Sequence, residues 1–153
     1  MATYPNPNLG RDLLLDDSGD LAIANGDLAV TPSGRICLLQ DVEHALDTMA
    51  GDLFGHPTYG AGVGRLVGEE GPTARQGFVR AVKDALVYEP GVAARIVPES
   101  VTVTILSADA TEVSVRTEFD AIDRDAIVPL NLVHRFGLDE YGGTAGAAAV
   151  EVI

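Results

Sequence analysis

The chain is poor in cysteine and in aromatic residues, and both shortages limit what it can be. Cys37 is the single cysteine among 153 residues, so the chain can form neither an internal disulfide nor a cysteine metal cluster. Its neighbours in the sequence are apolar, and we expect a buried, inert thiol. Tryptophan is absent and aromatic residues make up 5% of the chain. The core must therefore consist mainly of leucine, valine, isoleucine and alanine.

Basic residues are also scarce: 10 Lys and Arg stand against 23 Asp and Glu, a formal net charge of −13. Binding of phosphate groups requires clustered Lys and Arg, so this charge argues against nucleic acid and against an anionic membrane surface as ligands. It serves either solubility or docking against basic surfaces of protein partners. No apolar run approaches ~18 residues, and no basic segment followed by an apolar run opens the chain, so we expect neither a membrane span nor a secretion signal.

What is present indicates one folded domain. Hydrophobic residues make up 46% of the chain, which excludes a disordered protein. Met1–Gly10 is expected to be an extended arm. Three short apolar pieces follow, Leu13–Asp16, Leu21–Ala24 and Leu28–Thr31, and Asn25-Gly26 between the last two is a strong hairpin signal. We predict a small exposed β-meander and find no internal repeat.

Two amphipathic helices are predicted in the middle of the chain. The first is expected from Ile36 to Met49, because apolar residues three or four positions apart give one buried stripe. This stripe consists of Leu39, Val42, Leu46 and Met49. The second begins at Gly71-Pro72, since proline is tolerated in the first turn, and ends before Pro90. Its buried face consists of Phe78, Val82 and Leu86. A short helix is expected from Val63 to Val67.

Alternating apolar and polar residues predict strands after the second helix. Val101–Ile105 and Val113–Phe119 alternate in this way and are expected to pair as a half-buried hairpin. A third run, Ile127–Phe136, is interrupted by Pro129, which predicts an edge strand or an irregular piece. Beyond it, Gly142–Ala149 is rich in glycine and alanine.

Together these elements predict an α+β fold, with two main helices packed on a small antiparallel sheet. An N-terminal β-meander and a flexible C-terminal tail, ending in a β-prone peptide at Val150–Ile153, are expected to flank it. The expected divisions are an arm and meander over residues 1–34, a core domain over 35–126 and a C-terminal extension over 127–153.

No motif for metal, nucleotide or serine chemistry is present. The three histidines, His44, His56 and His134, lack the spacing of a metal site. Gly60–Gly64 is glycine-rich, but no buried strand is predicted before it and it has no lysine. No Gly-x-Ser-x-Gly turn occurs. We therefore predict neither a cofactor nor a metal.

Carboxylates are numerous, and a glycosidase needs only two of them across a cleft. Asp47, Asp52 and Glu89 are the best candidates for that role. One of the two acids must lie in an apolar pocket that raises its pKa, however, and polar or turn residues flank each of these three. We predict no enzyme. Glu89 is notable for another reason, since a negative charge at the end of a helix is disfavoured by the helix dipole.

Four segments occur in a characteristic order: Leu46–Asp52, then His56-Pro57-Thr58-Tyr59-Gly60, then Tyr88-Glu89-Pro90, then Val101–Phe119. In this order they resemble the baseplate wedge, or sheath initiator, proteins of contractile phage tails and related injection systems. The resemblance covers roughly residues 38–122, a little over half of the chain. One position departs from it: the family has Arg after Glu-Pro, where this chain has Gly91.

The resemblance implies an assembly part that links wedge subunits to the tail tube or hub and initiates sheath polymerisation. It implies two sets of contact residues. Partner-binding residues would be Gly51, Asp52, Pro57, Tyr59, Gly60, Tyr88, Glu89 and Pro90, with Arg95 in place of the missing Arg. Docking of a sheath strand, by strand addition at a sheet edge, would involve Val101, Val103, Ile105, Val113 and Val115.

The partners so implied are other wedge subunits, tube or hub proteins and the sheath protein, in several copies around a sixfold assembly. The location would be a virion tail baseplate assembled in the host cytoplasm, or a cytoplasmic contractile injection particle. Two other functions stay open: a cell-wall hydrolase of lysozyme type, a label that part of this family has carried, and an adaptor domain of a non-phage complex.

Overall fold

The computed structural model describes residues 9–124, 126–138 and 144–151. These residues form three α-helices, a two-stranded sheet and a four-stranded sheet, so the predicted α+β class is confirmed. Residues 1–8 of the arm expected over Met1–Gly10, and residues 142–143 and 152–153 of the expected tail, lie outside the described residues.

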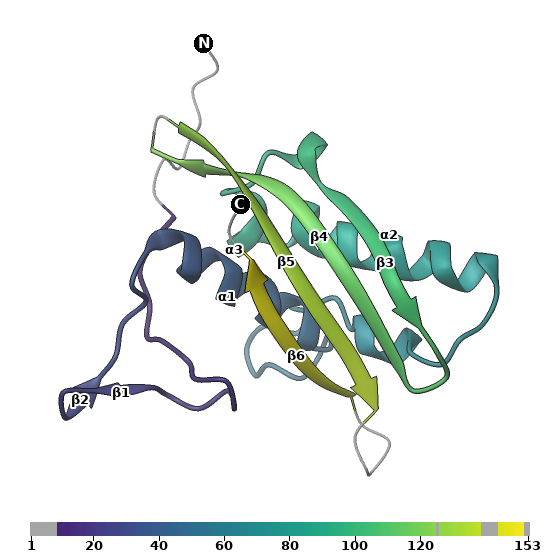
Figure 1. Cartoon of the computed structure of the whole chain (residues 1–153), viewed down its shortest axis with the longest axis horizontal. Helices are drawn as coiled ribbons and strands as arrows, with labels where there is room; N and C mark the ends of the chain where they lie inside the picture. The colour runs from purple at the N-terminus through teal and green to yellow at the C-terminus, as the bar shows by residue number, and fades with distance from the viewer. Residues whose placement is uncertain (1–8, 125, 139–143, 152–153) are drawn as a thin grey trace.

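The main sheet has four antiparallel strands in chain order (Figure 1). They are β3 (Thr102–Ala108), β4 (Glu112–Asp123), β5 (Ala126–Leu138) and β6 (Thr144–Glu151). The predicted hairpin is β3 with β4, in which Val103 lies opposite Thr117. That hairpin is half of a larger sheet, because the chain continues through two further strands.

The run around Pro129 is not an irregular piece but part of a continuous strand; the expected edge is present only locally, because β5 has a partner on one side alone at Pro129. Strand β5 is continuous and pairs along its whole length with β4, where Pro129 lies opposite Asp120. Strand β6 pairs with β5 only from Asn131 to Leu138. There is thus no β6 bond at Pro129 for its missing N–H to break, and the proline is accommodated inside a long strand.

The C-terminal segment, expected to be a flexible tail, also belongs to the main sheet. Residues 144–151 pair with β5 as strand β6, although glycine and alanine have low strand propensity. The domain boundary expected between residues 126 and 127 falls at the start of β5, directly after the β4–β5 turn. Residues assigned to a C-terminal extension therefore belong to the sheet of the core domain.

Helices α1 (Gly34–Asp47) and α2 (Pro72–Tyr88) cover one face of this sheet (Figure 1). Helix α1 packs near β5 and β6, and α2 packs near β3. The shorter pieces are α3 (Pro90–Ala93) and the 3₁₀ turns η1 (Val63–Leu66) and η2 (Pro98–Ser100). Within residues 9–124, 126–138 and 144–151, no helix is long and apolar enough to cross a membrane.

The predicted helix limits hold within two residues, with one consequence for the core. Ser33 caps α1 by accepting a hydrogen bond from the Ile36 N–H (3.3 Å). The helix ends at Asp47, so Met49 lies beyond it and is 38% exposed. Its predicted burial is wrong, because the helical period does not continue past the cap at Thr48.

The core forms between the helices and the inward face of the sheet. Alternate β4 residues point into it: Val113, Val115, Thr117, Phe119 and Ala121. The predicted alternation of this strand is confirmed. Phe78 of α2 meets Phe136 of β5 edge to face, with ring centroids 5.4 Å apart.

The N-terminal meander folds as a closed unit of three extended runs, two of which contain β1 and β2 while the first joins them through isolated bridges, and we call residues 12–31 the β triangle. Backbone amides at the centres of the three runs bond in a cycle: Leu14 N–H donates to Ala29 O, Ala29 N–H to Ala22 O and Ala22 N–H to Leu14 O, each at 2.9 Å. The predicted Asn25-Gly26 turn joins β1 (Ile23–Ala24) to β2 (Asp27–Leu28), and both turn residues have positive φ. The triangle stands apart from the main sheet (Figure 1).

This cycle reveals an internal repeat where none was expected from the sequence. Each run reads Asp-Leu, then one residue, then an aliphatic residue: Asp12–Leu15, Asp20–Ile23 and Asp27–Val30. The first Leu of each repeat pairs with the last residue of the preceding one, in cyclic order. The repeat is only four residues long, so it becomes recognisable when the pairing shows its threefold register.

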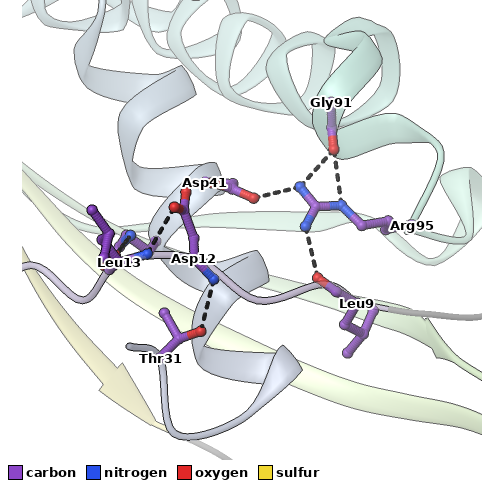
Figure 2. Close-up of polar contacts among 8 residues, drawn as sticks. Leu9, Asp12, Leu13, Thr31, Asp41, Gly91 and Arg95 are labelled. Carbon is purple, nitrogen blue, oxygen red and sulfur yellow. Dashed lines mark hydrogen bonds and ion pairs between the residues drawn. The ribbon is translucent and has the colours of Figure 1, made fainter. Parts of the chain in front are cut away.

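Arg95 connects the N-terminal arm, just before the β triangle, to the core (Figure 2). Its guanidinium donates to Leu9 O (2.9 Å) in the arm, to Gly91 O (2.6 and 2.9 Å) in α3, and to the Asp41 carboxylate (2.6 Å) in α1. Leu9 is only 1% exposed. The nearby Cys37 is buried as expected, and this burial, with a smaller effect of Asp41, raises the pKa of its thiol.

We predict that Arg95→Met lowers the free energy of unfolding by about 3 kcal/mol, because several charge-assisted hydrogen bonds disappear and Asp41 stays half-buried without its cation. Arg80→Met is the matched control. Arg80 is 83% exposed and pairs with Asp84 at 3.6 Å, so its loss should cost less than ~0.5 kcal/mol. Urea denaturation measures both. Equal losses would contradict the assigned role of Arg95.

Candidate functional site

The loop after α1 and the end of α2 enclose an open groove of about 730 Å³. Two motifs that lie far apart in the sequence meet there, the His-Pro-Thr-Tyr-Gly turn and the Tyr-Glu-Pro helix end. The groove is lined by His56, Thr58, Tyr59, Gly60, Ala61, Arg65, Ala81, Asp84, Ala85, Tyr88, Glu89, Pro90 and Gly91. Tyr88 is 73% exposed, so a large aromatic side chain is accessible to solvent at the edge of the groove.

Gly60 holds the groove's loop against the end of α1. Its φ is +100°, and a Cβ atom at this position would overlap the carbonyl oxygen of Thr48. On either side of this approach, Ala61 N–H donates to Ala45 O (2.8 Å) and Gly62 N–H donates to Thr48 O (3.0 Å). Only glycine fits here, since it alone adopts this φ without strain and has no Cβ.

Glu89 closes the groove from the other side. It is the C-cap residue of α2 and the N-cap residue of α3. Its carboxylate accepts a hydrogen bond from Gly60 N–H (3.3 Å). The charge at the end of α2 is thus partly offset by a backbone donor. Burial, and then the Glu89 carboxylate, raises the pKa of the Tyr59 phenol, which keeps that hydroxyl protonated and able to donate.

The structure brings together five of the predicted partner-binding residues: Tyr59, Gly60, Tyr88, Glu89 and Pro90. Gly51, Asp52 and Pro57 lie in the same loop outside the groove lining. Arg95 is placed elsewhere, with its guanidinium occupied by Leu9, Gly91 and Asp41.

Two charged residues of the groove were not expected from the sequence. Asp84 lies one helical turn before Tyr88, and that spacing could have identified it. Arg65 comes from η1, and no sequence signal connects it with the helix end.

The residues expected to dock a sheath strand separate into two groups. Strand β3 forms an edge of the sheet, and Val103 and Ile105 lie on it, partly buried against the core. Val113 and Val115 lie on β4, which is paired on both sides by β3 and β5. These two cannot offer free backbone groups to an added strand, so that part of the expectation is wrong. Val101 lies just before β3 and is buried.

A second cluster of ionisable groups lies between α1 and β5. His134 is 1% exposed, and its Nε2 lies 2.8 Å from the Asp47 carboxylate. Burial raises the pKa of Glu43, one turn before Asp47 on α1; Asp47 adds to this shift and His134 opposes it. No sequence signal marks this acid, because only the packing of α1 on the sheet buries it.

The candidate hydrolase acids are not assembled into one site. Asp47 contacts His134, Glu89 contacts Gly60, and Asp52 is exposed in the loop. Among the described residues no group of three His, Cys, Asp or Glu side chains could hold a metal ion. The groove offers a concave shape, aromatic surface and hydrogen-bonding groups, which are features of a binding site.

Comparison with protein families, with curated proteins and with solved structures gives no match to this chain.

We predict that Gly60→Ala lowers the free energy of unfolding by more than about 3 kcal/mol, because backbone strain and overlap with Thr48 add. Gly51→Ala is the control, since Gly51 has the same φ of +100° but a Cβ added there would meet nothing within 4 Å. That change should cost about 1 kcal/mol. Thermal or urea unfolding measures the difference, and similar losses for both variants would refute the close approach.

A second prediction concerns the buried acid. The folded state raises the pKa of Glu43, so the stability that this group contributes is fully present below its unfolded pKa and is lost as the pH rises through the folded pKa. Glu43→Gln should therefore raise the melting temperature near pH 7, and the gain should vanish near pH 4. Calorimetry across this range measures it. A gain that persists at the acidic end would contradict burial as the cause.

Proposed function

We propose that this chain is a structural baseplate wedge protein of a contractile tail or injection particle. It links wedge subunits to the tail tube or hub and initiates polymerisation of the sheath. Its partners are the other wedge subunits, the tube or hub proteins and the sheath protein, in several copies around a sixfold assembly. It works in the virion baseplate or in a cytoplasmic injection particle.

The observation that carries this proposal is the junction of Thr48, Gly60 and Glu89. The resemblance to wedge proteins rests on four segments. Three of them include these residues, and each segment alone is a weak signal. Gly60 touches the Thr48 carbonyl on one side and donates to Glu89 on the other. Segments related by resemblance alone thus also share one site, which supports a common role as an interface.

The edge of the main sheet supports the second part of the proposal. Strand β3 has β4 on one side only, and its seven residues can accept an added strand through backbone hydrogen bonds. We propose that an extended arm of the sheath protein adds there. Val103 and Ile105 keep β3 anchored to the core while its outer edge is used.

The alternative is a cell-wall hydrolase of lysozyme type, and one observation favours it. Glu43, with a raised pKa, lies one helical turn from Asp47, and such a pair of unequal acids is what a glycosidase requires. Against it, Asp47 is bound to a buried histidine, and neither acid lines the groove. We propose the structural role because the motifs of the resemblance meet at the groove and not at this cluster.

The test uses single variants of the tagged full chain in the organism that encodes it, with particles purified by sedimentation and viewed by electron microscopy. Glu89→Lys reverses the charge at the groove, and Tyr88→Ala removes the exposed aromatic side chain. Both should leave the domain folded by circular dichroism and should lower incorporation into particles at least about tenfold, as expected at an interface hot spot. Glu99→Lys is the matched control, an exposed charge reversal outside the groove.

The same purified proteins, together with Glu43→Gln, are applied to peptidoglycan in a zymogram. No lysis is expected. Lysis by the unmodified chain that disappears in Glu43→Gln would replace the structural proposal by the hydrolase. Normal incorporation of both groove variants would remove the groove from the interface.

A further inference from the structure

The β triangle presents all of its large alternating side chains on one face. In an antiparallel pair, residues directly opposite each other share a face, as do residues two apart along a strand. The pairs are Leu13 with Val30, Leu15 with Leu21, and Ile23 with Leu28. Each run contributes two residues spaced by two, so the six side chains form one continuous apolar face. The central residues of the runs, Leu14, Ala22 and Ala29, point to the opposite side.

This apolar face is uncovered. Ile23 is 73% exposed, Leu21 48% and Leu28 45%, and Leu13 and Val30 are close to 40%. These five are almost half of the exposed large hydrophobic residues in the described part of the chain. Single exposed aliphatic residues are ordinary on protein surfaces, but a contiguous group of this kind marks an interaction site.

The net charge of the β triangle determines what can cover its apolar face. An exposed aspartate precedes the first leucine of every repeat: Asp12, Asp20 and Asp27. By the same alternation these three lie at the starts of the runs on the side of Leu14, Ala22 and Ala29, so they act on a partner through their charge at short range and not by direct contact across the apolar face. Asp16 and Asp17 follow the first run, and the only basic residue between residues 9 and 31 is Arg11. Five acidic charges against one basic charge would repel a second copy docked through the same face, and would repel an anionic membrane.

Hydrogen bonds from helix α1 fix the orientation of the triangle relative to the core. The side chain of Gln40 on α1 pairs with the backbone of the first run, donating to Leu13 O (2.9 Å) and accepting from Leu15 N–H (3.0 Å). Within the triangle, Thr31 accepts from Asp12 N–H (3.2 Å) and ties its first residue to its last, as Figure 2 shows. Its apolar face is therefore presented in a fixed orientation, which lowers the entropic cost of docking.

We propose that the β triangle is a docking module for a partner protein whose contact surface has an apolar centre surrounded by lysine or arginine. Apolar contact with Ile23, Leu21 and Leu28 supplies affinity, and the excess of acidic charge in the triangle favours a basic partner and selects against acidic surfaces. This site is separate from the groove at Glu89, so it stands whether or not the proposed wedge function does.

The chemistry can be tested with a defined probe. A short amphipathic helical peptide with a leucine stripe flanked by lysines is titrated against the full chain, next to a peptide with glutamate in place of each lysine. The lysine peptide should bind with 1:1 stoichiometry, and the glutamate peptide should bind at least about tenfold more weakly. Binding should also weaken severalfold between low salt and ~0.5 M salt, because the aspartates of the triangle are exposed and salt screens their charge.

Variants locate the binding. Ile23→Asp should weaken binding of the lysine peptide about tenfold, and Asp20→Lys combined with Asp27→Lys should remove the preference between the two peptides. Phe54→Ser is the control, because Phe54 is fully exposed in a different segment. Circular dichroism checks that each variant is folded. Equal binding of both peptides, or binding unchanged by Ile23→Asp, would overturn the proposal.

A photoreactive benzophenone side chain at Leu28 identifies the occupant. Cross-linking to the lysine peptide supports the proposal. An adduct between two copies of the chain, confirmed as a dimer by sedimentation, would show that the face serves self-association. An adduct with residues 1–8 of the same chain would show that the arm covers it. Either of these two results overturns the proposed partner.

Discussion

The contact between the Gly60 backbone and the Thr48 carbonyl fixes the site on which the proposed interface depends. It brings the loop against the end of α1, and only a residue without a Cβ permits it. Once the loop is there, Gly60 N–H can reach Glu89, so the ends of α1 and α2 share one surface. Tyr88 is presented beside that surface because Glu89, its neighbour, is held in place.

The sequence predicted those elements whose signals are local. The period of Leu39, Val42 and Leu46 predicted α1, Pro72 and Pro90 marked the limits of α2, and Asn25-Gly26 predicted the turn of the triangle. Local signals do not predict the strands whose formation depends on pairing with a neighbouring strand. Strand β5 tolerates Pro129 because β6 does not reach it, and β6 forms from a segment of low strand propensity because β5 offers a paired edge.

The candidate site was predictable in part for the same reason. Tyr59, Gly60, Tyr88 and Glu89 came from short motifs, and the structure places them around one groove. Arg95 was expected at that interface, but its guanidinium holds the N-terminal arm, a role that needs Leu9 and Asp41 and so is invisible to spacing. The half-buried Glu43 and the threefold register of the β triangle likewise arise only from packing between distant segments.

The most direct test of the structural role is electron cryomicroscopy of particles purified through a tag on this chain. A wedge protein should be found in contractile particles in which another polypeptide fills the groove beside Tyr88 and Glu89, with an added strand along the outer edge of β3. A chain that purifies free of any such particle, or one that sits in a particle with both the groove and the β3 edge open to solvent, would contradict the structural role.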